Sequence, residues 1–223
     1  MQIGLPEILY EDNHIIAVNK PHGWLVQGDQ TGDKTLADWV KAYIKVKYEK
    51  PGDVFLGVIH RLDRPAAGIT LFARTSKGLE RMNKLFHDRN ITKKYEALIP
   101  KLVGPESAHL VHWIKKWNEK NTVEVSDVQK DKEFKQAVMD YTLKEASKDQ
   151  VCLEINLHTG RPHQIRAQLS KMGMPILGDL KYGAMQPWHD GNIALKAVLV
   201  EFEHPIQHIP IKISLSKNHW QNK

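Results

Sequence analysis

The stretch that decides the fold reads VIHRLDRPAAGITLFA and covers residues 58–73. An apolar run over residues 54–59 predicts a buried strand, and a second run over residues 69–73 predicts another. Pro65 cannot donate a hydrogen bond to a sheet, and Gly68 can adopt a positive φ, so the residues between the runs are expected to form a loop. The chain therefore places polar side chains on a loop between two buried strands.

This loop carries a single carboxylate, Asp63, with Arg61 two residues before it and Arg64 directly after it. Guanidinium groups within a few Å favour the ionised carboxylate and typically lower its pKa by ~1–3 units. An ionised carboxylate is a poor general acid but can act as a nucleophile or stabilise developing positive charge. A surface salt-bridge cluster is the alternative interpretation of the same spacing.

Four segments resemble, in the same order, the motifs of the RluA-type pseudouridine synthases. Residues 19–23 (NKPHG) resemble the opening motif, and residues 60–63 (HRLD) resemble the central motif. Residues 93–98 (KKYEAL) resemble the tyrosine motif. The third motif is matched by residues 157–166 (LHTGRPHQIR), continuing to residues 173–179 (GMPILGD). The resemblance covers nearly the whole chain.

The resemblance implies an α+β fold, a mainly antiparallel mixed sheet with a central catalytic cleft and a few flanking helices. It implies that residues 1–223 form a single catalytic domain without the small RNA-binding module that the family often carries ahead of it. The implied activity converts specific uridines of rRNA or tRNA to pseudouridine. This reaction breaks the bond from uracil nitrogen to ribose and rejoins the turned base through carbon. It requires an extruded base but no metal, redox agent or other cofactor.

The resemblance also implies roles for individual residues. Asp63 is the expected carboxylate catalyst, Arg166 its counter-ion, and Tyr95 the ring that stacks on the target uracil. Arg61 is expected to fill the space that the flipped nucleotide leaves. His60 is a further candidate for the RNA-binding side, although its alternation with Arg61 along the chain favours a supporting position behind the loop.

Three other residues are candidates for binding the RNA backbone. Pro162 suits the first position of a helix, so Arg161 and His163 are expected at a helix N-terminus, which is a natural anion site. Lys20 at the end of a predicted strand could approach a phosphate. A solvated lysine is the alternative interpretation.

Two further helices are predicted from capping residues and apolar spacing. Thr35 is a plausible N-cap for a helix whose apolar face runs through residues 36–44. Thr75 or Ser76 can cap a second helix that reaches about His87. Both apolar faces are expected to pack into the core.

The composition fits a globular protein with a polyanionic partner but does not demand one. The 223 residues are 41% hydrophobic, the net charge is +6, and no apolar run approaches the ~20 residues of a membrane span. Cys152 is the only cysteine, which suits a reducing compartment. We therefore expect a cytoplasmic protein without a membrane segment. The resemblance implies RNA as its partner, and we expect it to act as a monomer without an obligate protein partner.

The middle of the chain, residues 101–148, is polar and rich in lysine. Its lysines are interleaved with aromatic residues, a pattern that suits either an RNA backbone or a solvated hairpin. These residues are Lys115, Lys116, Lys120, Lys130, Lys132, Lys135, Trp113, Trp117 and Phe134.

Two other functional classes remain open. Ala66 and Ala67 stand where relatives usually have Thr-Ser, which raises the alternative of a catalytically impaired RNA-binding or RNA-chaperone protein. His109 and His112 are three residues apart, as metal ligands can be, but no matching ligand pair accompanies them. A metal-dependent hydrolase therefore lacks its cluster, and no metal site is expected.

Overall fold

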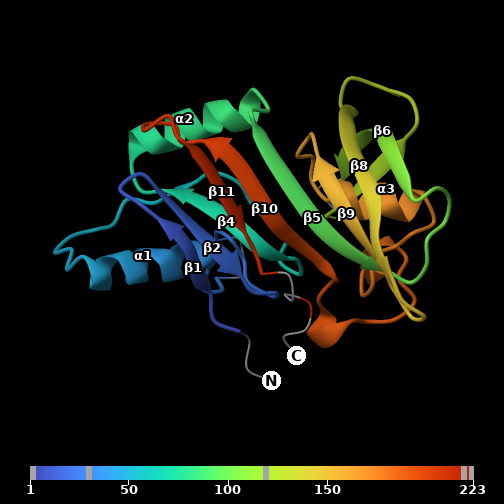
Figure 1. Ribbon diagram of the computed structural model, residues 1–223, viewed down its shortest axis with the longest axis horizontal. Helices are drawn as coiled ribbons and strands as arrows, with labels where there is room; N and C mark the ends of the chain where they lie inside the picture. Colours follow the sequence, from blue (N-terminus) through green and yellow to red (C-terminus); the bar gives the residue numbers. More distant parts are fainter. Residues whose placement is uncertain (1–3, 29–31, 118–120, 217–219, 221–223) are drawn as a thin grey trace. The chain divides into compact units, whose positions relative to one another are not determined.

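A computed structural model describes residues 4–28, 32–117, 121–216 and 220 (Figure 1). The chain divides into two compact units, the first made of Met1–Ile91 with Ala197–Lys223 and the second of Thr92–Lys196. Lys120, one of the lysines of the basic middle segment, lies outside the described residues.

The first unit is a sheet with a helix on each face. Its elements are β1 (Glu7–Glu11), β2 (Ile15–Lys20), α1 (Leu36–Lys47), β3 (Gly57–Val58), β4 (Ala67–Ala73), α2 (Ser76–His87), β10 (Leu195–Glu203, within the unit from Ala197) and β11 (Pro210–Ser214). The strand order is β1-β2-β4-β10, with β11 pairing with β10 and β3 with β4.

Alternating side chains of β2 explain why both faces of this sheet are covered. Ile15 packs in a cluster with Met82 of α2, whereas Ile16 packs in a cluster with Val40 of α1. Figure 1 shows α1 and α2 on opposite sides of these strands. Every residue of β4 is buried, as expected for a central strand covered on both faces.

The second unit is a purely antiparallel sheet in the order β5-β9-β8-β6-β7. Its elements are β5 (Ile91–Ile99, within the unit from Thr92), β6 (Ser107–Trp117), β7 (Thr122–Ser126), β8 (Lys135–Ala146), β9 (Val151–Leu157), α3 (Gln164–Lys171) and two short 3₁₀ turns, Leu180–Tyr182 and His189–Gly191. Ala167 of α3 packs against Ala137 of β8 and Ile114 of β6, so α3 covers one face of this sheet.

The α+β prediction and both capping predictions are confirmed. The hydroxyl of Thr35 accepts a hydrogen bond from the backbone N–H of Asp38, and the Asp38 carboxylate accepts one from the Thr35 backbone, which completes a capping box. Thr75 caps α2 by accepting from Gly78 N–H at 3.0 Å.

Two boundaries differ from the sequence-based expectation. The run 54–59 forms only the two-residue strand β3, because only Gly57 and Val58 pair with β4. The strand β4 begins at Ala67, because Gly68 pairs with Lys20 of β2. Gly68 does adopt a positive φ of +110°, but it lies within the strand and not in the loop.

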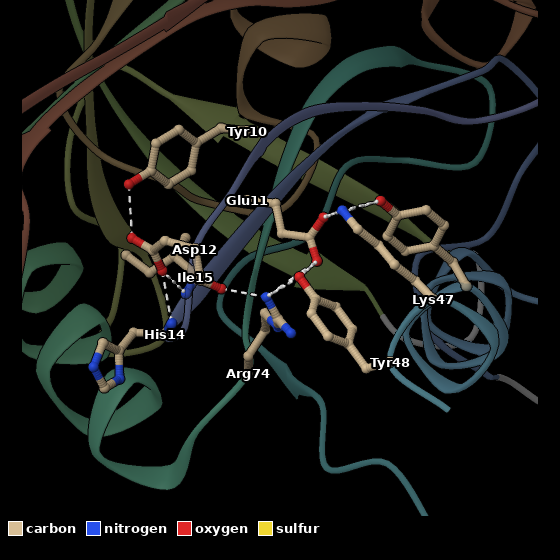
Figure 2. A network of polar contacts seen from close by, with 9 residues as sticks. Tyr10, Glu11, Asp12, His14, Ile15, Lys47, Tyr48 and Arg74 are labelled. Carbon is tan, nitrogen blue, oxygen red and sulfur yellow. Dashed lines mark hydrogen bonds and ion pairs between the residues drawn. The ribbon is translucent and has the colours of Figure 1, made fainter. Parts of the chain in front are cut away.

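The turn between β1 and β2 is fixed by two neighbouring carboxylates (Figure 2). Glu11 accepts hydrogen bonds from Lys47 at 2.6 Å and from the Tyr48 hydroxyl at 2.8 Å, and it lies 3.0 Å from Arg74. Asp12 accepts from the backbone N–H groups of its own turn. The network joins β1 to α1 and to the end of β4, so the sheet and helix of the first unit are held by charge as well as by packing.

Among the helices in the described parts of the chain, none is long and apolar enough to cross a membrane.

Candidate active site

The loop that carries Asp63 is tied to the segment after β2 by its backbone. The amide of Gly23 donates to the carbonyl of Arg64 at 2.9 Å, and the Arg64 Nε donates back to the Gly23 carbonyl at 3.1 Å. Within the loop, Ala66 N–H donates to the Asp63 carbonyl at 3.0 Å. His22 Nδ1 lies 2.8 Å from the Pro65 carbonyl. These contacts fix the backbone on both sides of a half-buried Asp63.

Lys20, the last residue of β2, is buried beneath the loop that carries Asp63. Its Nζ donates to the carbonyls of Trp24 at 2.8 Å, Pro21 at 3.1 Å and Arg64 at 3.2 Å, and the residue is 0% exposed. Burial lowers the pKa of Lys20 to about 7, although the nearby Asp63 carboxylate opposes the shift. The alternative interpretation of Lys20 as a solvated lysine is therefore wrong, because the residue is fully buried. Its three hydrogen bonds are made within the protein, and a contact of Lys20 with an RNA phosphate remains a prediction.

The small residues after the loop are explained by close packing. Ala66 and Ala67 are almost fully buried. A Cβ on Gly68 would lie 2.2 Å from the carbonyl oxygen of Ala197, far inside van der Waals contact. The backbone of β4 therefore approaches β10 in a way that only glycine allows.

His60 and Arg61 differ in their surroundings. His60 Nε2 accepts a hydrogen bond from Leu71 N–H at 3.1 Å, and its ring stacks on Phe86 of α2 with centroids 5.2 Å apart. This contact agrees with a supporting position behind the loop, and a direct contact of His60 with RNA remains a prediction. Arg61 is exposed and so is accessible to a ligand.

In the second unit Arg166 is held by a buried ion pair. Its Nε donates to Asp179 Oδ2 at 2.7 Å and its Nη2 to Asp179 Oδ1 at 2.8 Å, which is a bidentate fork. Arg166 is 5% exposed and Asp179 1% exposed. The ring of Tyr182 lies 5.0 Å from the guanidinium carbon. Two of the guanidinium nitrogens are thus fixed by one carboxylate, which sets the orientation of the third.

Asp179 and Tyr182 are functional candidates that sequence reasoning missed. Asp179 ends the segment that resembles the third motif, but nothing local connects it with Arg166, 13 residues earlier. The Tyr182 hydroxyl lies 2.8 Å from His163 Nδ1 and accepts a hydrogen bond from Val123 N–H at 3.0 Å. Tyr182 therefore supports both Arg166 and His163.

Tyr95 lies on the face of its sheet that α3 covers. It pairs with Ile155 of β9, which pairs with Tyr141 of β8, and Tyr141 shares its face with Ala137, where α3 packs. Tyr95 is 8% exposed. Within the second unit, Tyr95 and the helix of Arg166 thus share one side of the sheet.

The expected start of α3 at Pro162 is wrong. The helix begins at Gln164, and its N-cap His163 has a left-handed φ of +49° and makes no side-chain capping bond. Gln164 instead accepts from Arg161 N–H at 3.0 Å, and the Arg161 Nε donates to the Gln136 carbonyl at 2.9 Å. An anion site at Arg161 and His163 remains a prediction.

Asp63 lies in the first unit, whereas Tyr95 and Arg166 lie in the second. Within its own unit, the loop of Asp63 is held by hydrogen bonds, Arg166 is fixed by Asp179, and Tyr95 lies on the side of the sheet that α3 covers. Their action on one nucleotide, and the catalytic cleft that it requires, remain predictions.

Comparisons with known proteins place these features in a family context. The sequence profile of the family described as RNA pseudouridylate synthase matches residues 14–171, which include Asp63, Tyr95 and Arg166. The ribosomal large subunit pseudouridine synthase D of Xylella fastidiosa is 30% identical over 221 residues, covering 93% of this chain and 64% of that protein. The protein of the same name from Vibrio parahaemolyticus is 32% identical over 217 residues, covering 90% of this chain and 63% of that protein.

Solved structures show the same fold. The human RNA pseudouridylate synthase domain containing 4 protein superposes with a TM-score of 0.78 at 21% identity, covering 96% of this chain and 89% of that chain. This chain spans slightly less than two thirds of the length of the two bacterial relatives.

Proposed function

This chain belongs to the RNA pseudouridylate synthase family, and we propose that it isomerises specific uridines of ribosomal or transfer RNA to pseudouridine. The observation that carries this proposal is the loop of Asp63, which is held by hydrogen bonds to Lys20, His22 and Gly23 and in which Asp63 itself is only half-buried. A carboxylate on a fixed loop is suited to act on a bound ligand. The names of the two bacterial relatives support ribosomal RNA as the substrate class.

In this proposal Asp63 is the carboxylate that reacts with, or stabilises charge on, the flipped uridine while the bond from uracil nitrogen to ribose breaks. Arg166 is the cation that pairs with Asp63 and orients it, and Asp179 fixes the orientation of the Arg166 guanidinium. Tyr95 stacks on the uracil ring. Arg61 fills the space that the nucleotide leaves. These roles need an extruded base and a site that excludes water.

The proposal includes the setting in which the protein works. We infer a single catalytic domain that acts on RNA in the cytoplasm as a monomer, without an obligate protein partner. The net charge of +6 supports a polyanionic substrate. The basic middle segment and the Arg161–His163 pair are the surfaces that we assign to the RNA backbone.

The experiment that tests the proposal maps pseudouridine in total RNA from cells with and without the protein, and in the same RNA after incubation with the purified chain. We expect one or a few uridines to become pseudouridine only when the protein is present. RNA binding that weakens with salt but leaves every uridine unmodified would contradict the proposal and favour the impaired RNA-binding protein.

A further inference from the structure

Three polar side chains converge on the face of the second sheet that α3 does not cover. His109 of β6 lies directly opposite Asp140 of β8, and His158 follows the last residue of β9. His109 Nδ1 lies 2.5 Å from Asp140 Oδ1, and His158 Nε2 lies 2.6 Å from Asp140 Oδ2. One ligand atom from each of the three residues lies within 4.8 Å of the others.

We propose that His109, Asp140 and His158 bind a divalent transition-metal cation of the Zn²⁺ class. Two imidazoles and one carboxylate form a donor set that such cations favour, and three protein ligands leave further positions for water or substrate. The nitrogen and oxygen ligands of one Zn²⁺ lie roughly 3.3 Å apart. The two histidine–aspartate pairs, now 2.5 and 2.6 Å apart, must therefore open slightly to admit the cation, while the three ligand atoms stay within the 4.8 Å that already separates them at most. This movement is feasible because all three side chains are partly exposed, His109 by 61%, Asp140 by 38% and His158 by 39%.

The site is not the pair His109 and His112, at which no metal was expected from the sequence. His109 and His112 are three residues apart on one strand, so their side chains point to opposite faces of the sheet. His112 is buried and lies 2.8 Å from Gln168 of α3. The ligands that do meet come from β6, from β8 and from the residue after β9, and the two bonded pairs are 31 and 18 residues apart along the chain.

A bound cation would also link β6, β8 and the end of β9. Because the three strands separate on unfolding, a cation that binds only the folded site raises the stability of the folded chain. The thermal midpoint with added Zn²⁺ is therefore a second readout, independent of any activity on RNA.

The chain offers a matched control for the binding measurement. His87 is exposed, and its Nδ1 lies 2.9 Å from Asp88, so it forms a histidine–carboxylate pair on the surface of the first unit. It belongs to no group of three such ligands among the described residues. His87→Gln removes one exposed histidine outside the proposed site, so the binding of Zn²⁺ at the proposed site should be the same in His87→Gln as in the wild type.

The test is calorimetric titration of the full chain with ZnCl₂ at pH 7.5, in wild type, His158→Gln, Asp140→Asn, His109→Gln and His87→Gln. We expect one saturable site in the wild type and in His87→Gln, and affinity that falls at least about tenfold in each of the three ligand variants. Zn²⁺ should raise the thermal midpoint of the wild type and of His87→Gln only.

Equal binding by the wild type and all three ligand variants would overturn the proposal, as would a wild type without a saturable site. Circular dichroism checks the folding of each variant. If one ligand variant does not fold, the proposal is judged on the other two. His109 has the most exposed side chain of the three.

Discussion

The two units hold their proposed catalytic groups in different ways. In the first unit, the buried ammonium of Lys20 fixes the loop of Asp63 by donating to three backbone carbonyls. In the second, the buried carboxylate of Asp179 fixes Arg166 through a two-bond ion pair. The ammonium group of Lys20 is bound by neutral backbone carbonyls and can lose its proton. The carboxylate of Asp179 is instead compensated by the opposite charge of Arg166. Substitution and pH should therefore affect the two units differently.

The largest effect on stability is expected for Asp179→Ala. Removing one partner of a buried ion pair typically costs about 3–5 kcal/mol, because the remaining charge loses its compensation. The matched control is Asp127→Ala, which removes an exposed partner of Lys171 at the other end of α3 and should cost less than about 1 kcal/mol. Urea unfolding of both variants measures the difference, and equal losses would contradict a buried, compensated pair.

Gly68→Ala is expected to cost about 3 kcal/mol, because the new methyl group meets the Ala197 carbonyl at 2.2 Å and the backbone has a positive φ. Gly104→Ala separates the two causes. Gly104 has a similar φ of +100°, but nothing lies within 4 Å of the added Cβ. The control should cost only about 1 kcal/mol, and equal unfolding midpoints for the two variants would show that the close approach of β4 to β10 is unimportant.

Lys20→Met is expected to cost about 2 kcal/mol at pH 7, because three backbone carbonyls lose their donor. It should also change the pH dependence. Burial lowers the folded-state pKa of Lys20 to about 7, from 10.5 in the unfolded chain. Between these values the unfolded chain binds more protons, so this lysine makes the wild type more stable as pH rises.

Urea unfolding at pH 7 and pH 9 measures this contribution as the difference between wild type and Lys20→Met. The wild type should gain stability relative to the variant at pH 9. Parallel changes in the two proteins would contradict a lysine with a lowered pKa.

The smallest effect is expected for Thr35→Ala, which removes the N-cap of α1 and should cost about 1 kcal/mol. In the described part of the chain, the Thr35 side chain at the N-terminus of α1 bonds to Asp38 and not to the charged groups of Lys20 or Asp179, so the activity per folded molecule should not change. A loss of activity at unchanged fold would show that α1 contributes to the site. The measurement is the unfolding midpoint together with the rate of pseudouridine formation.

Local sequence patterns were sufficient to predict the elements but not the partners. The caps at Thr35 and Thr75 and the strands beside them depend on residues within a few positions, and the structure confirms them. The role of Lys20 depends on the Arg64 carbonyl, 44 residues away, and no local pattern reports such a contact. The same holds for Asp179 and Arg166, which come from different elements.

One prediction failed because a local rule was applied where the fold follows another. Pro162 favours a helix start, but Gln164 turns back to bond Arg161 and Thr159, so the helix begins later. No metal site was expected at His109 and His112. The two residues lie on strand β6, where a spacing of three positions places the two rings on opposite faces.

The central claim is that the carboxylate of Asp63 performs the reaction. The most direct test is the single-turnover rate of pseudouridine formation in Asp63→Asn beside Asp53→Asn, an exposed carboxylate ten residues earlier in the chain. The account predicts that Asp63→Asn keeps the wild-type unfolding midpoint and loses roughly 10³-fold or more in rate, while Asp53→Asn keeps the wild-type rate. A folded Asp63→Asn variant that turns over at the wild-type rate would contradict it.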